Sequence, residues 1–322
     1  MHAIRFDKTG GSDVLKLETV ELPAPAQGEV RLRHTAIGVN FIDTYHRSGL
    51  YPVPLPSGLG REAAGVVDAV GEGVTAFKVG DRVATASGPL GMYAQASNIA
   101  AKELVKLPAG ISDEVAAAAM LKGLTAWYLL HETYKVRRGE TILVHSAAGG
   151  VGLILCQWGK ALGANVIGTV GSQAKAQLAR DAGAAHVLLL ADGWEKKVRE
   201  ITGGEGLPVV YDSVGKDTFE ASLNCLRPRG LMVSFGNSSG AVPPFSPGIL
   251  SAKGSLYLTR PTLFHYIATR PELERGAAEL FAVMQSGAVK VEVRQRFPLA
   301  DAKAAHDALE SRRTTGATVL LP

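Results

Sequence analysis

The chain has 322 residues, of which 46% are hydrophobic and 20% are charged. These proportions are typical of a globular protein with a large core and exclude a disordered chain, while the length suits two domains. The 34 Lys and Arg residues are scattered and exceed the 30 Asp and Glu residues slightly, which suits a phosphate-bearing ligand but does not indicate nucleic acid.

Cysteine content and apolar segments bear on metal binding and localisation. The two cysteines, Cys156 and Cys225, cannot form a four-ligand structural zinc site. The opening residues lack the apolar segment of a signal peptide, and no stretch of 18 or more apolar residues indicates a membrane span. We therefore expect a cytoplasmic protein without a membrane partner.

The first third of the chain predicts a β-rich domain, a small barrel or sandwich. Its short apolar or alternating runs, separated by Gly and Pro clusters, are residues 28–39, 63–71 and 78–86. Residues 112–133 then read as helical. Ser112 and Asp113 can cap a helix that continues through alanines, and a second helical stretch is expected after Gly123.

From residue 140 to about 260, strands alternate with helices. The predicted strands are 140–146, 165–170, 186–190, 207–214 and 231–236, and the predicted helices are 151–163 and 173–183. Strands rich in Val, Ile and Leu that alternate with helices indicate βαβ units and a parallel, doubly wound sheet. The tail adds helices at 272–286 and 300–313 and a last strand from Ala317. The fold class is therefore α/β.

A glycine-rich turn between the strand at 140–146 and its helix predicts a dinucleotide site. Gly149, Gly150 and Val151 lie where backbone N–H groups can approach a pyrophosphate and the helix N-terminus adds partial positive charge. Ala147 replaces the first glycine of the usual pattern, but the strand, turn and helix are in the required order. The alternative is a glycine-rich turn in another α/β fold.

The end of the next strand distinguishes NADP from NAD. An NAD site carries an acid there for the ribose 2′-hydroxyl, but residues 168–172 contain none. Ser172 can donate to a 2′-phosphate and Lys175 can neutralise it, so NADP is favoured. The alternative for Lys175 is a solvated position on a helix face.

Four segments carry a resemblance to a known family. They are Ala147 to Gly152, VVYDSVG (209–215), LMVSFGNSSG (231–240) and KGSLYLTRP (253–261). With them the chain resembles, over its whole length, the zinc-independent quinone oxidoreductases of the medium-chain dehydrogenase/reductase superfamily, relatives of zeta-crystallin. The resemblance implies a β-rich, GroES-like catalytic domain at 1–121, completed by 262–322, and a Rossmann NADP-binding domain at 122–261.

Positions that bind zinc in related dehydrogenases carry other residues here. Asn40 matches a Cys ligand and Arg61 a His ligand, and neither side chain ligates zinc well. Residues 85–100, where a structural-zinc lobe would lie, contain no Cys. We therefore expect no metal, and we expect Arg61 and Glu62 to form a structural ion pair.

The activity implied by the resemblance is hydride transfer from NADPH to a quinone, with donors near the acceptor oxygen. Asn40 and Tyr45 are implied near the nicotinamide and Tyr51 in the acceptor cleft, although all three could instead cap or pack. Arg260 is expected to be structural. The further cofactor contacts implied are Thr125, Ser213, Val214, Gly215, Phe235, Gly236, Asn237, Ser238 and Arg312.

Two further expectations concern NADP affinity and assembly. The family often has a Tyr at the position of Leu190, so affinity for the 2′-phosphate is expected to depend more on Ser172 and Lys175. Residues 253–260 include a β-prone strand at the predicted edge of the sheet, and exposed edges invite pairing. Because the family forms dimers through this edge, a homodimer is implied.

Two alternative functions remain at this stage. NADPH-dependent reduction of the double bond of an enal or enone needs the same oxygen-polarising cleft. RNA binding is compatible with the slight excess of basic residues, but a basic stripe with interleaved aromatic residues is missing from the sequence.

Overall fold

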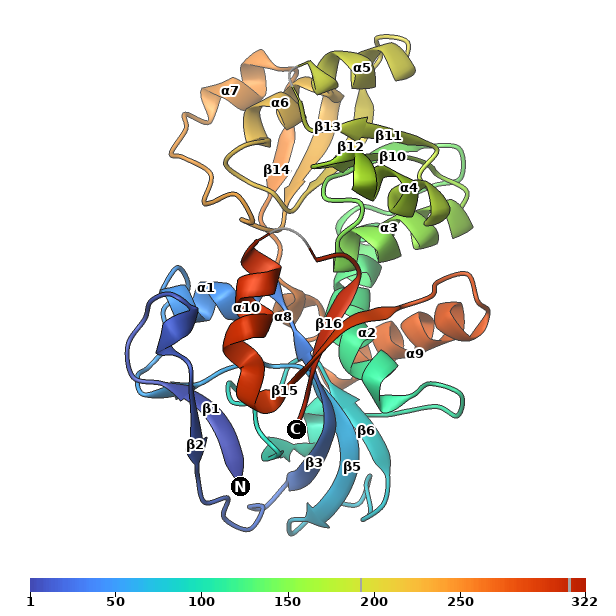
Figure 1. The fold of residues 1–322 in the computed structure, drawn as a ribbon. Coiled ribbons are helices and arrows are strands. Elements are labelled where there is room, and N and C mark those ends of the chain that lie inside the picture. The colour runs from blue at the N-terminus through green and yellow to red at the C-terminus, as the bar shows by residue number, and fades with distance from the viewer. Residues whose placement is uncertain (192, 312–313) are drawn as a thin grey trace. The chain divides into compact units, whose positions relative to one another are not determined.

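The structure, a computed structural model, describes residues 1–191, 193–311 and 314–322 (Figure 1). Contacts divide the chain into two compact units, of which the second comprises Thr125–Tyr266 and Ser286–Lys290 and the first the remainder. The expected domain boundaries, 121/122 and 261/262, differ by a few residues from these divisions. One reason is that helix α2 (Asp113–Tyr128) begins in the first unit and ends in the second, so the sequence marks no break there.

The first unit contains a seven-stranded sheet, in which six strands follow the order β15-β16-β3-β5-β6-β8 and β7 also pairs with β3. The strands are β3 (Glu29–Val39), β5 (Ala63–Val70), β6 (Arg82–Thr85), β7 (Ala96–Ala100), β8 (Val105–Lys106), β15 (Val293–Pro298) and β16 (Ala317–Leu321). Successive side chains of a strand point to opposite faces. In β3, Val30 and Leu32 therefore point into the core, whereas Arg33, the residue after Leu32, is exposed. A smaller sheet pairs β1 (His2–Phe6) with β2 (Lys16–Thr19) and β4 (Ser57–Gly58).

The helices of the first unit are α1 (Phe41–Ser48), most of α2, α9 (Arg270–Gln285) and α10 (Ala302–Glu310). The expected break in α2 at Gly123 is wrong, because the helix runs through this residue without interruption. A Cβ atom at Gly123 would lie 2.5 Å from Cδ1 of Leu280 on α9. The glycine therefore permits close approach of the two helices and does not end α2. A π-helical turn, Leu129–Thr133, follows α2.

The second unit contains a six-stranded, fully parallel sheet in the order β11-β10-β9-β12-β13-β14. Its strands are β9 (Thr141–Val144), β10 (Asn165–Val170), β11 (His186–Leu189), β12 (Leu207–Asp212), β13 (Leu226–Ser234) and β14 (Tyr257–Thr259). This is the doubly wound order of dinucleotide-binding sheets. The α/β prediction is confirmed, and β10 coincides with its predicted residues.

Helices cover the parallel sheet in two pairs (Figure 1). α3 (Gly150–Ala161) packs on α4 (Gln173–Asp181), and α5 (Trp194–Ile201) packs on α6 (Phe219–Asn224). Two short helices, α7 (Gly248–Ala252) and α8 (Leu263–Tyr266), complete the unit. In the part of the chain that the structure describes, no helix is both long and apolar enough to cross a membrane.

Candidate active site

Asn40 lies at the centre of a buried polar cluster in the first unit, directly after β3. Its side chain, 4% exposed, accepts a hydrogen bond from Lys122 Nζ at 2.7 Å through Oδ1. It donates through Nδ2 to Glu62 Oε2, also at 2.7 Å. Lys122 Nζ is 3.5 Å from the same carboxylate oxygen, and the other oxygen accepts from the backbone N–H of Leu121. The Asn40 amide thus joins the end of β3 to Glu62, which precedes β5, and to Lys122 on α2.

The expected ion pair between Arg61 and Glu62 is wrong. Glu62 is fully buried and forms its salt bridge with Lys122, whereas Arg61 Nη1 donates to the carbonyl oxygen of Gly88 at 2.9 Å. The turn before them explains the separation: Gly60 has a φ of +83°, and a Cβ there would lie 2.3 Å from the Tyr93 ring. Burial raises the pKa of Glu62, and the Lys122 ammonium opposes this rise.

The two predicted tyrosines lie together at α1. Tyr45 is 9% exposed on the helix, and the half-buried Tyr51 follows the helix end. Their ring centroids are 5.2 Å apart in an edge-on arrangement, and the backbone N–H of Tyr51 donates to the carbonyl oxygen of Tyr45. Asn40, which precedes α1, and this pair of tyrosines therefore belong to one short segment of the first unit, residues 40–51.

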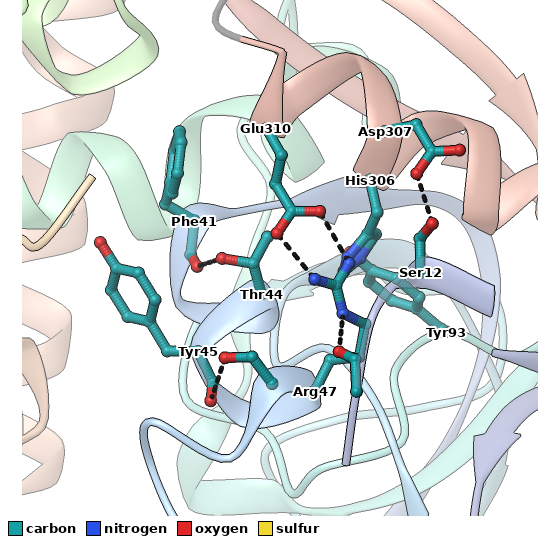
Figure 2. A network of polar contacts seen from close by, with 11 residues as sticks. Ser12, Phe41, Thr44, Tyr45, Arg47, Tyr93, His306, Asp307 and Glu310 are labelled. Atoms are coloured by element: carbon teal, nitrogen blue, oxygen red, sulfur yellow. Dashed lines mark hydrogen bonds and ion pairs between the residues drawn. The ribbon is translucent and has the colours of Figure 1, made fainter. Parts of the chain in front are cut away.

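A second polar network in the first unit extends from Asp43 to Glu310, and no sequence pattern indicates it. Figure 2 shows the part of this network around Tyr93, Arg47, His306 and Glu310. Tyr93 Oη donates to Asp43 at 2.9 Å and lies 3.2 Å from Nε2 of His306. Arg47, which is 3% exposed, lies 3.1 Å from His306 Nδ1 and donates two hydrogen bonds to the Glu310 carboxylate. In Figure 2 the ring of Tyr45 points away from this network.

Asp43 connects this second network to Asn40. Its Oδ2 accepts from the backbone N–H of Asn40 at 2.8 Å, which closes the first turn of α1. Burial raises the pKa of Asp43 to about 7, although the hydrogen bonds from Asn40 and Tyr93 lower it. The carboxyl group therefore binds a proton more readily than an exposed aspartate does.

The glycine turn of the second unit fits a pyrophosphate. Gly149 is the N-cap of α3 and provides no side-chain cap, so the first N–H groups of the helix are available to an anion. Glycine is also required nearby, since a Cβ on Gly152 would lie 2.1 Å from the carbonyl oxygen of Ser146. Ser146 itself has a φ of +52°, which turns the chain sharply after β9.

The end of β10 offers space and donors but no acid. Ser172 is exposed, is the N-cap of α4 and makes no capping hydrogen bond with its side chain. Lys175 lies in the first turn of α4, and its backbone N–H donates to the carbonyl oxygen of Ser172. A Cβ on Gly171 would meet no atom within 4 Å, which leaves open space beside Ser172. Leu190 packs against the apolar core of the unit.

The loops after β12 and β13 are held against each other. The backbone N–H of Ser238 donates to the carbonyl oxygen of Ser213 at 3.2 Å, and a Cβ on Gly236 would lie 2.5 Å from that same oxygen. Gly215 has a φ of +90°. Arg260 Nη1 donates to the carbonyl oxygens of Ser234 and Gly236 and so stabilises the start of the loop after β13. The predicted cofactor contacts of these loops are therefore brought together: Ser213, Val214, Gly215, Phe235, Gly236, Asn237 and Ser238.

Asp212, at the end of β12, organises the first of these loops. Its Oδ1 accepts from the backbone N–H groups of Val214 and Gly215 at 2.7 and 3.0 Å. Its Oδ2 accepts from the hydroxyl groups of Thr218 and Ser222 at 2.7 and 3.2 Å.

His145 connects Ser222, which donates to Asp212, with Thr169 on the neighbouring strand β10. The two ring nitrogens of His145 lie 2.8 Å from Ser222 Oγ and 2.7 Å from Thr169 Oγ1. Burial lowers the pKa of His145, against the attraction of Asp212. A neutral imidazole thus links the ends of β9 and β10 to the loop after β12, all at the edge where dinucleotides bind.

The remaining predicted residues are placed as follows. Thr125 is buried in α2 at the first position of the second unit, whereas Asn40, Tyr45 and Tyr51 belong to the first unit. Arg312 lies outside the described residues. Within the described ranges, no group of three or more His, Cys, Asp or Glu side chains could hold a metal ion.

The sequence did not predict the roles of Glu62 and Lys122 beside Asn40: Glu62 was expected to pair with Arg61, and Lys122 was not a candidate. The available signal was Lys122 itself, a single charged residue in the apolar run AAAAMLKGLTAW. A lysine inside such a helix requires a buried partner, because an isolated buried charge is costly. The sequence could not identify that partner.

Comparison with known proteins yields two family matches: "Alcohol dehydrogenase GroES-like domain" over residues 26–109 and "Zinc-binding dehydrogenase" over residues 150–282. The quinone oxidoreductase of Pseudomonas aeruginosa is 57% identical over 321 residues, with 99% of each chain covered. A 2-haloacrylate reductase of a Burkholderia species is 48% identical over 324 residues, which is 98% of this chain and 97% of the relative. Among solved structures, Escherichia coli quinone oxidoreductase complexed with NADPH superposes with a TM-score of 0.99, at 55% identity and complete coverage of both chains.

Proposed function

The chain belongs to the quinone oxidoreductase family of the medium-chain dehydrogenases and reductases, and from this premise we propose that it reduces quinones with NADPH. The observation that carries the proposal is full-length likeness, at 55–57% identity, to quinone oxidoreductases that include an NADPH complex. The acid-free end of β10 and the glycine turn before α3 support NADPH as the cofactor.

When bound, NADPH supplies the hydride; the protein supplies binding, orientation and charge. The uncapped N-terminus of α3 binds the pyrophosphate, and the loops after β12 and β13 bind further along the cofactor. Ser172 donates to the 2′-phosphate, and Lys175 neutralises part of its charge. The implied contacts of Thr125 and Arg312 with the cofactor belong to the same proposal.

On the acceptor side, Asn40 donates a hydrogen bond to the oxygen on which negative charge builds during reduction. Tyr45 and Tyr51 present an aromatic surface that suits a flat quinone ring. Hydride transfer to a quinone leaves the quinol anion, and solvent supplies the proton that completes the quinol, so a dedicated acid is not required. The metal-free character of the proposed reaction rests on Asn40 and Arg61, whose side chains are poor zinc ligands.

The direct test is NADPH oxidation, followed at saturating cofactor, with a naphthoquinone and with a 2-alkenal under the same conditions. We expect turnover of the naphthoquinone to exceed that of the alkenal. The second candidate function, reduction of an activated double bond, is favoured by one observation, the 48% identity to a 2-haloacrylate reductase. A large preference for the alkenal would establish that candidate instead.

Cofactor preference has its own test. Replacing Lys175 with Ala removes a cation that only a 2′-phosphate needs. We expect the Kd for NADPH to rise about tenfold or more, as for the loss of a charge-assisted hydrogen bond, and the Kd for NADH to stay unchanged. Equal changes for the two cofactors would contradict the assignment of Lys175.

We further propose a homodimer joined through β14 and a cytoplasmic location. β14 is a terminal strand of its sheet, and Tyr257 on it is 61% exposed, so the strand can pair with a second copy. Sedimentation at the mass of a monomer would contradict the dimer. The cytoplasmic location is supported by Cys156 and Cys225, both free buried thiols, and cell fractionation tests it.

A further inference from the structure

The cluster around Asn40 fixes which way its amide faces. A carboxylate only accepts hydrogen bonds, and an ammonium group only donates them. Glu62 therefore requires the amide nitrogen of Asn40, and Lys122 requires the amide oxygen, at 2.7 Å each. Turning the amide over would set donor against donor and acceptor against acceptor, so the two charged neighbours permit one orientation.

One donor of Asn40 is left over. An amide nitrogen carries two N–H groups, and Glu62 accepts one of them. The residues that the structure describes provide no acceptor for the second. A side chain that is 4% exposed and has a defined, unused donor is suited to a ligand oxygen.

We propose that Glu62 and Lys122 are positioning residues for reduction, which hold the Asn40 amide so that its second N–H meets the acceptor oxygen. The inference rests on the proposed function. Lys122 has the larger effect. Its ammonium polarises the amide through Oδ1 and so strengthens the N–H donors, because linked hydrogen bonds reinforce one another.

The charges of the pair also have opposite effects on the reaction. As hydride reaches the acceptor, its oxygen becomes negative, and a nearby uncompensated carboxylate opposes this change. Lys122 Nζ, 3.5 Å from the Glu62 carboxylate, cancels that repulsion. Losing the cation alone is therefore worse than losing both charges, which a role in stability alone does not predict for the chemical step.

The experiment compares kcat for quinone reduction, at saturating NADPH, in the full-length protein and three variants. We expect Lys122→Met to lower kcat about 100-fold, which is the lower end of the range for losing a donor to a developing oxyanion. We expect Glu62→Gln to lower kcat about tenfold, which is less than the loss of a whole donor. We expect the double variant to be about tenfold faster than Lys122→Met. Because the cluster acts on the acceptor, the Kd for NADPH, measured by fluorescence, should change less than about twofold in all three.

Controls separate this role from folding and from the proposed function. Lys16→Met removes an exposed lysine paired with Asp7 and should leave kcat unchanged. If Lys122→Met does not fold, the double variant, which buries no charge, decides: the inference requires that its kcat be lowered about tenfold. A double variant slower than Lys122→Met, or wild-type kcat in Lys122→Met, Glu62→Gln or the double variant, overturns the inference alone. Absence of quinone-dependent NADPH oxidation in the unmodified protein overturns the proposed function and, with it, the inference.

Discussion

In the first unit, a buried carboxylate lies beside a buried ammonium group, Glu62 beside Lys122, and the buried Arg47 reaches the half-exposed Glu310. In the second unit, the buried Asp212 is satisfied by neutral donors alone, two backbone N–H groups and two hydroxyl groups. Both arrangements supply the buried carboxylate with hydrogen-bond donors, but they position different parts of the protein. The charged cluster orients one side chain, Asn40, whereas Asp212 with its neutral donors shapes a backbone loop.

This difference predicts how each unit fails. Removing one member of a charged pair leaves the opposite charge without its partner. The resulting loss of unfolding free energy depends on how well water can reach the remaining charge. Removing Asp212 leaves several donors without an acceptor inside the core, where each loss adds to the next. The following changes test that distinction, from the largest expected effect to the smallest.

Asp212→Ala should be the most destabilising. It leaves the N–H groups of Val214 and Gly215 and two hydroxyl groups without their acceptor, and we expect the free energy of unfolding to fall by about 4 kcal/mol. Urea unfolding measures the loss. Asp7→Ala, at an exposed aspartate, is the matched control and should leave the midpoint unchanged. Equal midpoints for the two variants would mean that the loop does not need the carboxylate.

Arg47→Met should cost less than Asp212→Ala. The guanidinium is buried and donates to Glu310, to His306 and to the carbonyl oxygen of Gly10, but the Glu310 side chain is 39% exposed and regains water. We expect a loss of about 3 kcal/mol, at the lower end for a broken buried pair. Arg47→Lys is the control: it keeps the charge but not the two parallel hydrogen bonds, and it should recover part of the loss in a thermal melt.

The titration of Asp43 should make the stability of the first unit depend on pH. Burial raises its pKa from 3.8 to about 7, so the folded protein binds a proton that the unfolded chain releases between these values. The stabilisation is complete below about pH 4 and is lost as the pH rises through about 7.

Asp43→Asn keeps an acceptor for Tyr93 and for the N–H of Asn40 but does not titrate. The difference in unfolding free energy, wild type minus variant, should therefore fall by about 2 kcal/mol from pH 5 to pH 7. Melts at several pH values provide this difference, in which the titration of other groups cancels. A difference that stays constant over this range would show that Asp43 remains ionised.

Ser222→Ala should have the smallest effect. It removes the link between Asp212 and His145, two contacts of the Ser222 hydroxyl group at 3.2 and 2.8 Å, and leaves the backbone hydrogen bonds of the loop intact. We expect a loss of about 1 kcal/mol in unfolding free energy and a small rise in the Kd for NADPH. Ser246→Ala, in an exposed loop of the same unit, serves as the control.

The sequence predicts the second unit better than the first for a physical reason. Each βαβ segment is defined by neighbouring residues, and the apolar runs of β9, β10 and β12 can be read directly. The glycine turn is equally local. In the first unit, by contrast, Arg47 contacts His306 across 259 positions and Glu310 across 263, and no local pattern connects them.

The Arg61–Glu62 prediction failed for the same reason. Adjacent opposite charges suggest a pair, but the chain turns at Gly60 and carries Glu62 into the core, where Lys122 lies 60 positions further along the sequence. The position of Asn40 as a candidate site residue could be inferred from the family resemblance. The orientation of its amide could not, because it depends on two charged residues brought together by tertiary packing.

The pairing of β16 with β3 has a consequence for the order in which the protein takes shape during synthesis. The sheet that contains β3 is complete only when β16, about 280 residues later in the chain, has been synthesised. Almost all of the second unit, by contrast, has been synthesised once Tyr266 is added. The nucleotide-binding unit can therefore fold while the amide cluster is still being assembled. Chains stalled before β16 should resist protease in the second unit and remain sensitive in the first.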